Sequence, residues 1–173
     1  MEALFLFFIP LIFYVFFRVV FMNETDVIEE DLKKFDEGQR LIEFGFIDEA
    51  VMYFDKMVKQ YPKSAVAYGL RGKCHYLQNN YYTAIYNFEK ASTFSNSFPE
   101  VFLFKGICLF KIEDYEAALK EFNKATWFYR EQNPITYKWR GLTHKKLGNQ
   151  EAAQKDFQRS LKLGDKDIKS FIS

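Results

Sequence analysis

Residues 68–92 read YGLRGKCHYLQNNYYTAIYNFEKAS, and residues 102–126, 34 positions later, read FLFKGICLFKIEDYEAALKEFNKAT. Gly, Cys, Tyr, Ala, Phe and a Lys-Ala pair stand at the same places in both copies. A fixed period of this length is typical of proteins built from stacked structural repeats. The same period, 34, 34 and then 35 residues, is kept by Gly38, Gly72, Gly106 and Gly141, by Ala50, Ala84, Ala118 and Ala153, and by Phe54, Phe88, Phe122 and Phe157.

This period divides residues 31–167 into four units, 31–64, 65–98, 99–133 and 134–167. Within a unit the apolar residues recur at helical spacing, stop, and then resume, so each unit is predicted to be a helical hairpin. The first helix is expected to end at the equivalent residues Gly45, Asn79, Glu113 and Gly148. Gly and Asn tolerate the left-handed backbone conformation that ends many helices, whereas this conformation is expected to be less favourable for Glu113.

The pattern resembles the tetratricopeptide repeat, in the variant with an aromatic fourth residue and Arg-Gly at positions seven and eight. Two units carry this motif, as Tyr68, Arg71 and Gly72 and as Tyr137, Arg140 and Gly141. The resemblance covers Asp31 to about Asp167 and implies an all-α, right-handed solenoid of four hairpins whose first helices line a concave groove. One hairpin cannot bury its apolar face alone, so stacking builds the core.

The two ends of such a stack need polar surfaces. In the fourth unit the second helix carries Gln150, Gln154 and Ser160, and it is expected to face water. Residues 168–173 form a tail that is too short for an extra closing helix.

The amino terminus is predicted to be a transmembrane helix over residues 1–22, joined to the repeats by a linker at 23–30. Residues 3–17 are uncharged, and about 20 apolar residues span a bilayer. A cleaved signal peptide is the rival interpretation, but residues 1–22 lack its basic start and small-residue cleavage site. Whether the span is a plain tether or contacts a partner stays open. The residues assigned to the anchor are Phe5, Phe7, Phe8, Pro10, Phe13, Phe16, Phe17 and Arg18.

Lys and Arg beside a span set its orientation. Arg18, Lys33 and Lys34 all lie on its carboxyl side, so the repeats of this single-pass protein are expected in the cytoplasm.

No pattern of catalytic, metal-binding or cofactor-binding residues is present. His75 and His144 share the eleventh position of their units, and Cys74 and Cys108 share the tenth. Equivalent residues of neighbouring repeats lie too far apart for a disulfide, so the cysteines are interpreted as small buried residues. The formal net charge is +1 without a compact basic run, which argues against nucleic acid as a partner. We predict neither an enzyme nor a cofactor.

The groove is the predicted site of function, and its ligand is expected to be a peptide or protein surface. An apolar middle suits a helical or extended apolar segment, and Lys73, Lys138 and Lys145 would read acidic residues. Burial of Leu103, Ile107 and Phe110 by tight curvature is an equal alternative. The candidate groove residues are Phe35, Gln39, Ile42, Lys73, Tyr76, Leu103, Ile107, Phe110, Lys138, Leu142 and Lys145.

The family's clamp for the terminal carboxylate of chaperones uses Lys, Asn and Arg at set positions. Phe35, Gln39, Leu70, Glu100 and Phe104 stand there instead, so that clamp is absent.

Charge is distributed unevenly along the chain. Residues 23–64 contain 6 Lys and Arg against 11 Asp and Glu, net −5, whereas residues 133–173 contain 9 against 4, net +5. The leading hypothesis is a membrane-anchored adaptor or accessory subunit of a larger integral membrane complex, in translocation, assembly or envelope biogenesis by analogy. The alternatives are a self-assembling scaffold and a repeat protein that works beyond the cytoplasm.

Overall fold

The structure, a computed structural model, describes residues 12–16 and 26–168. These residues are helices and turns without a strand. The helices that follow residue 35 are α2 (Asp36–Glu43), α3 (Ile47–Gln60), α4 (Ala65–Leu77), α5 (Tyr81–Phe94), α6 (Pro99–Lys111), α7 (Tyr115–Phe128), α8 (Pro134–Lys146), α9 (Gln150–Lys162) and the short 3-10 helix η1 (Lys166–Ile168).

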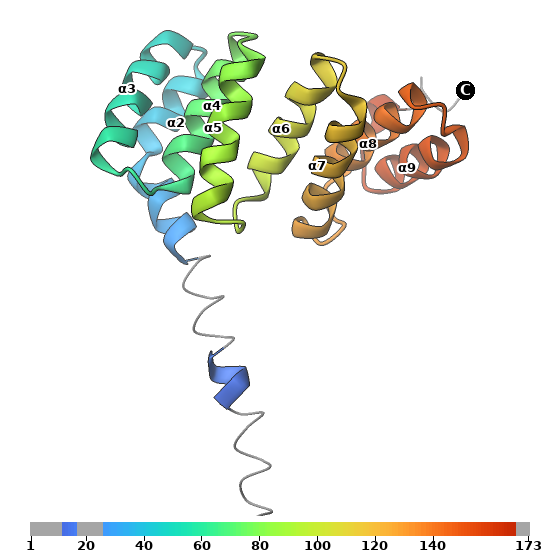
Figure 1. Ribbon diagram of the computed structural model, residues 1–173, viewed down its shortest axis with the longest axis horizontal. Helices are drawn as coiled ribbons and strands as arrows, with labels where there is room; N and C mark the ends of the chain where they lie inside the picture. The colour runs from blue at the N-terminus through green and yellow to red at the C-terminus, as the bar shows by residue number, and fades with distance from the viewer. Residues whose placement is uncertain (1–11, 17–25, 169–173) are drawn as a thin grey trace, which may run out of the picture.

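The helices form a solenoid in which each one packs on the next along the chain (Figure 1). α4, α6 and α8 begin at Ala65, Pro99 and Pro134, the residues with which the second, third and fourth predicted units begin. Because consecutive helices run in opposite directions, the turns inside the hairpins lie along one edge and the links between hairpins along the other. We call the edge that carries the turns inside the hairpins the turn edge.

The turn inside each hairpin has a left-handed residue at the position expected from the sequence. The φ angles are 81° at Gly45, 61° at Asn79, 66° at Glu113 and 80° at Gly148. At Glu113 the N–H donates to Phe110 O (3.1 Å), and the next N–H, of Asp114, donates to Leu109 O (3.0 Å). These bonds satisfy the last carbonyls of α6 and fix the reversal of the chain.

Large phenylalanines fill the space between the helices of each hairpin. Phe54, Phe88 and Phe122 are at most 1 % exposed, and Phe157 is 2 % exposed. Each ring lies against the glycine at the eighth position of its unit. The glycine is therefore needed for space, since a side chain there would meet the ring.

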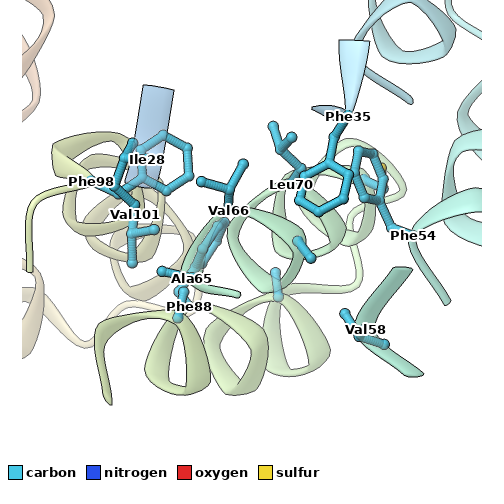
Figure 2. Packing of buried hydrophobic residues seen from close by; sticks show 14 of the residues in the cluster. Ile28, Phe35, Phe54, Val58, Ala65, Val66, Leu70, Phe88, Phe98 and Val101 are labelled. Atoms are coloured by element: carbon cyan, nitrogen blue, oxygen red, sulfur yellow. The ribbon is translucent and has the colours of Figure 1, made fainter. Parts of the chain in front are cut away.

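The core divides into three clusters of decreasing size along the chain. The first joins the repeats of α2–α5 and includes Ile28 before them and Val101 after them. Figure 2 shows Phe35, Phe54 and Leu70 at one end of this cluster and Ile28, Phe98 and Val101 at the other. The second is centred on α6 and α7. Among the described residues, the buried members of the third are Ala153, Phe157 and Ile168, with Leu142 and Leu161 packed against them.

The first repeat continues from a helix that begins upstream. Residues 26–34 are helical, and only a turn at Phe35 separates them from α2. The N–H of Phe35 still donates to Asp31 O (3.0 Å), and the N–H of Gln39 donates to Phe35 O (3.1 Å). The side chain of Phe35 is fully buried against Phe54 and Tyr61, with ring centroids 6.3 and 5.7 Å away. Residues 26–43 therefore form one nearly continuous helix that enters the core.

The expected single-pass membrane location is contradicted. Within 12–16 and 26–168, no helix is both long enough and apolar enough to cross a membrane. Of the assigned anchor, Phe5, Phe7, Phe8, Pro10, Phe17 and Arg18 lie outside the described residues, and Phe13 and Phe16 are exposed.

The carboxyl end of the stack is only partly as expected. Gln150 and Gln154 face water, but Ser160 is fully buried and its hydroxyl donates to Pro134 O at 2.9 Å. Ile168, counted as the first residue of the tail, is fully buried in the third cluster. η1 thus closes part of the end that a further helix would cover.

Candidate functional site

The candidate groove residues differ widely in exposure. Phe35, Leu103 and Ile107 are buried, with 0, 5 and 3 % of their surface exposed. Lys145 is exposed. The residues of intermediate exposure are Gln39, Ile42, Lys73, Tyr76, Phe110, Lys138 and Leu142.

The burial of Leu103 and Ile107 follows from the place of α6 in the stack. α6 contacts α4 and α8 as well as its neighbours α5 and α7. Both side chains join the second core cluster, whose partly buried members include Tyr76 and Trp139 from the adjoining repeats. The sequence left open whether these residues line the groove or are buried. In the structure, Leu103 and Ile107 are buried by the neighbouring helices.

A row of aromatic contacts joins the first helices of successive repeats. The ring centroids of Tyr76 and Phe104 are 5.1 Å apart, and those of Phe110 and Trp139 are 5.3 Å apart. In each pair the twelfth residue of one unit meets the sixth residue of the next. Sequence reasoning did not select Phe104 and Trp139 for the groove, although an aromatic sixth residue in two successive units was the available signal.

The candidate cations are not equivalent. The ammonium of Lys73 lies 2.6 Å from the carboxylate of Glu100, and that of Lys138 lies 3.5 Å from Asp165. These two charges are already balanced within the chain. Lys145 takes part in none of the ion pairs found in the described part of the chain. Lys145 is therefore the groove cation that a ligand can meet without first displacing an internal partner.

A second cation marks the same end of the solenoid. Lys111 is exposed, and its ammonium lies 5.9 Å from the centroid of the Trp139 ring. Trp139 is thus in contact with Phe110 on one side and covered by Lys111. We call Phe110, Lys111, Trp139 and Lys145, which lie on α6 and α8, the aromatic–cationic patch. Contacts join the first three, and Lys145 is included because it stands at the twelfth position of its unit, as Phe110 does.

Other charges form a ladder that holds the repeats together. Lys105 lies 3.4 Å from Glu121 in its own hairpin and 3.2 Å from Glu89 in the preceding one. Arg140 repeats this geometry with Asp156 (2.6 Å) and with Asn123, whose side-chain Oδ1 accepts at 3.1 Å. These cations occupy the seventh position of their units. These ion pairs therefore stabilise the stack, and the charges of Lys105 and Arg140 are neutralised within the chain.

The histidines have the environment of packing residues. Burial lowers the pKa of both His75 and His144, and the Nδ1 atoms of both are buried without a hydrogen-bond partner. Among the described residues, no group of three or more His, Cys, Asp or Glu is placed to hold a metal ion.

Both cysteines are buried and unpaired, as the spacing of the repeats predicted. Burial raises the pKa of each thiol to about 12. A protonated, inaccessible thiol is a poor nucleophile and a poor metal ligand.

Comparison with known families and structures identifies the fold. Residues 136–165 match the tetratricopeptide repeat family, and residues 45–125 match the family described as anaphase-promoting complex, cyclosome, subunit 3. Comparison with curated protein sequences gave no match.

Among solved structures, a crystal structure of MamA superposes with a TM-score of 0.69 at 19 % identity, covering 82 % of this chain and 87 % of that one. MamA from Desulfovibrio magneticus RS-1, residue 41 to the end, gives 0.68 at 18 % identity, covering 82 % and 76 %. The first repeat domain of Spaghetti (RPAP3) bound to the HSP90 peptide SRMEEVD gives 0.60 at 22 % identity, covering 63 % and 87 %. At these identities the likeness is one of fold.

Proposed function

We propose that the chain is a tetratricopeptide-repeat protein and acts as a non-catalytic adaptor, which holds a segment of a partner protein against the concave side of its last two repeats. The observation that carries this proposal is the aromatic–cationic patch. It combines the Phe110–Trp139 pair with an exposed Lys145 that has no ion-pair partner in the described chain.

The chemistry of the patch favours an acidic segment that also carries apolar side chains. Aromatic rings supply a large contact area, and exposed ammonium groups next to them select a carboxylate and reject a cation. The solved structure of the Spaghetti domain, which is similar in fold, is bound to the peptide SRMEEVD, and that sequence includes two glutamates and an aspartate. This supports an acidic polypeptide as the kind of ligand, while its identity for this chain stays a proposal.

The mode of binding proposed for this chain differs from capture of a terminal carboxylate. Phe35 and Leu70, which stand at two of the clamp positions, are buried at 0 and 2 % exposure. Lys73 of the second repeat forms an ion pair with Glu100 of the third repeat. We therefore propose an internal acidic segment as the ligand, with its acidic residues at Lys145 and Lys111.

The test is selection of binders from a displayed library of random peptides, followed by fluorescence anisotropy with the enriched sequences. Enriched peptides are expected to combine acidic and apolar residues. Phe110→Ser and Lys145→Glu should each weaken their binding by about tenfold, because they remove contact area and reverse a charge. Lys162→Glu, an exposed change at the end of α9, is the matched control and should bind as the parent does.

Peptides without acidic residues, or equal affinity for the parent and for Lys145→Glu, would contradict the proposal. Circular dichroism of each variant checks that the repeats remain folded.

A further inference from the structure

The turn inside the first hairpin differs from the other three in a way that packing does not explain. Phe44 and Phe46 flank Gly45 and are 73 and 54 % exposed. Phe46 is the residue before α3, where the other hairpins carry Asn80, Asp114 and Asn149. Neither phenylalanine belongs to a core cluster of the described residues, so core packing does not account for two aromatic rings at this turn.

Asp114 shows what the polar residue does at this position. Its carboxylate accepts a hydrogen bond from the N–H of Ala117 at 3.1 Å, whereas Phe46 provides no such bond. Asn80 and Asn149 make no side-chain cap bond either, so the feature that sets the first turn apart is its two exposed rings.

Acidic residues flank these two rings in the sequence, and one of them, Asp48, accepts a hydrogen bond from Gln78 at 2.7 Å. Glu43, Asp48 and Glu49 are all exposed, and residues 43–49 contain no basic residue. Glu43 is the last residue of α2, where the helix dipole disfavours a negative charge. We call Glu43, Phe44, Phe46, Asp48 and Glu49 the acidic knuckle. A partner surface for it must be basic at the rim and must offer aliphatic or aromatic contact.

The last hairpin of the same chain presents such a surface on the same turn edge. α8 ends at Lys145 and Lys146, which are both exposed, and Leu147 follows at intermediate exposure. Residues 142–150 contain no acidic residue. Lys146 stands at the thirteenth position of its unit, and Glu43 stands at the same position of the first unit.

The charge along the turn edge therefore reverses from one end to the other. The thirteenth residues of the four units are, in order, Glu43, Leu77, Lys111 and Lys146. Two such edges placed side by side in opposite directions bring each acidic knuckle against a basic last turn, twice per pair. The net charges of −5 over residues 23–64 and +5 over residues 133–173 favour the same arrangement.

The turn edge is open for this contact in the described structure. Residues 26–34 enter the solenoid at the opposite edge, where Ser64 donates a hydrogen bond to Asp31 (Figure 1). The helix that leads into the repeats thus leaves the edge with the acidic knuckle uncovered.

From these observations we propose that a second copy of the chain docks on the turn edge, related by a two-fold axis, with each acidic knuckle against Lys146 and Leu147 of the other copy. Lys111 and Lys145 border both this edge and the aromatic–cationic patch, but the acidic knuckle, Lys146 and Leu147 are not members of the patch. Variants of these residues therefore test the interface separately from the groove.

The experiment is sedimentation velocity of the full chain with two charge-reversal variants, Glu43→Lys and Lys146→Glu. The parent is expected to dimerise, and each variant alone should dissociate about tenfold more readily because the change repels at both contacts. An equimolar mixture of the two variants should regain the dimer. In the mixed pair, one contact has the original charges and the other has them exchanged, so both are attractive.

Controls separate this interface from general charge effects and from misfolding. Glu131→Lys and Lys162→Glu change exposed charges near the opposite edge and should leave the dimer intact. Phe44→Gln/Phe46→Asp installs residues that the second and third repeats carry at the same positions, so it should fold and be monomeric. It should also bind the groove peptides as the parent does.

A parent that stays monomeric at every concentration would overturn the proposal. The same holds if both variants dimerise like the parent, or if their mixture stays monomeric.

Discussion

Gly106 lies directly against the ring of Phe122, so that a Cβ added to Gly106 would fall 2.7 Å from Phe122 Cε1. The same relation holds between Gly72 and Phe88, at 2.7 Å, and between Gly141 and Phe157, at 2.5 Å. No Cβ fits at that distance without a shift, and the ring is held in the core. The period of the sequence is therefore the period of a contact between the two helices of a hairpin.

We predict that Gly106→Ala destabilises the protein by about 1–3 kcal/mol and that Gly106→Leu does so more strongly, because both overpack the hairpin. Chemical denaturation measures the free energy of unfolding. The matched test is Gly106→Ala combined with Phe122→Leu, which should lose less than the sum of the single changes, since a smaller ring makes room. Strict additivity would show that the two residues do not collide.

Glu113→Gly should stabilise the protein by about 0.5–1 kcal/mol, because a non-glycine residue at φ 66° is strained and glycine is not. Asn79→Gly, at φ 61°, should gain less, since Asn tolerates this region. Lys120→Gly, on the exposed side of α7, is the control and should lose about 1 kcal/mol. Thermal unfolding followed by circular dichroism ranks the three, and a loss at Glu113→Gly would contradict the prediction.

Arg140→Met should destabilise by about 3 kcal/mol or more, because it leaves the buried carboxylate of Asp156 without its cation. In the second repeat, Arg71 donates at the same position to the neutral amide of Asn87, at 2.7 Å, and its ion-pair partner Asp55, at 3.2 Å, is exposed rather than buried. Arg71→Met is therefore the matched control, and it should cost less. Urea unfolding of both variants decides the comparison; equal losses would mean that the charge of Asp156 does not matter.

The histidines predict that stability falls in mild acid. Burial lowers the pKa of His75 and His144 in the folded state, so the unfolded chain binds protons more readily. Their contribution is present above the unfolded pKa of about 6.5 and is lost as the pH falls through the lower folded values. Asp156 opposes this at His144, since its Oδ2 lies 3.9 Å from Nε2.

The test replaces both residues by leucine, which stands at the same position in the other two repeats as Leu41 and Leu109. His75→Leu/His144→Leu should flatten the difference in melting temperature between pH 7.5 and pH 5.5. An unchanged difference would assign the pH dependence to carboxylates.

Cys74 and Cys108 should resist a thiol reagent in the folded protein at neutral pH. Burial raises the pKa of both thiols to about 12, so hardly any thiolate is present and access is blocked. Labelling is expected to proceed at the rate of unfolding and to be complete in denaturant. Rapid labelling under native conditions would contradict the burial of these residues.

The fold was largely predictable because its determinants are local and recur. Each unit has a glycine that contacts a phenylalanine, as Gly106 contacts Phe122. Each unit also has a left-handed residue at its turn, such as Asn79 or Gly148. The upstream end does not repeat, and its determinants are not local. The continuous helix through residues 26–43 depends on Phe35, whose packing on Phe54 and Tyr61 joins residues far apart in the sequence.

The candidate surface was predictable only in part. A position in a repeat specifies a face of one helix, but neighbouring helices decide whether that face is open. Leu103 and Ile107 are therefore buried, although their positions were read as groove positions. The pairing of Lys73 with Glu100 links two repeats and has no signature in either one alone.

The third core cluster, built from Ala153, Phe157 and Ile168, has a consequence for ligand binding. In a stack where each repeat is stabilised by its neighbours, the terminal unit with the smallest core unfolds locally before the rest. Backbone amides of α8 and α9 should then exchange with solvent faster than those of α4. Trp139 and Lys145 lie on α8, so a ligand held there would slow this exchange, and its measured affinity would include the work of keeping the last hairpin folded.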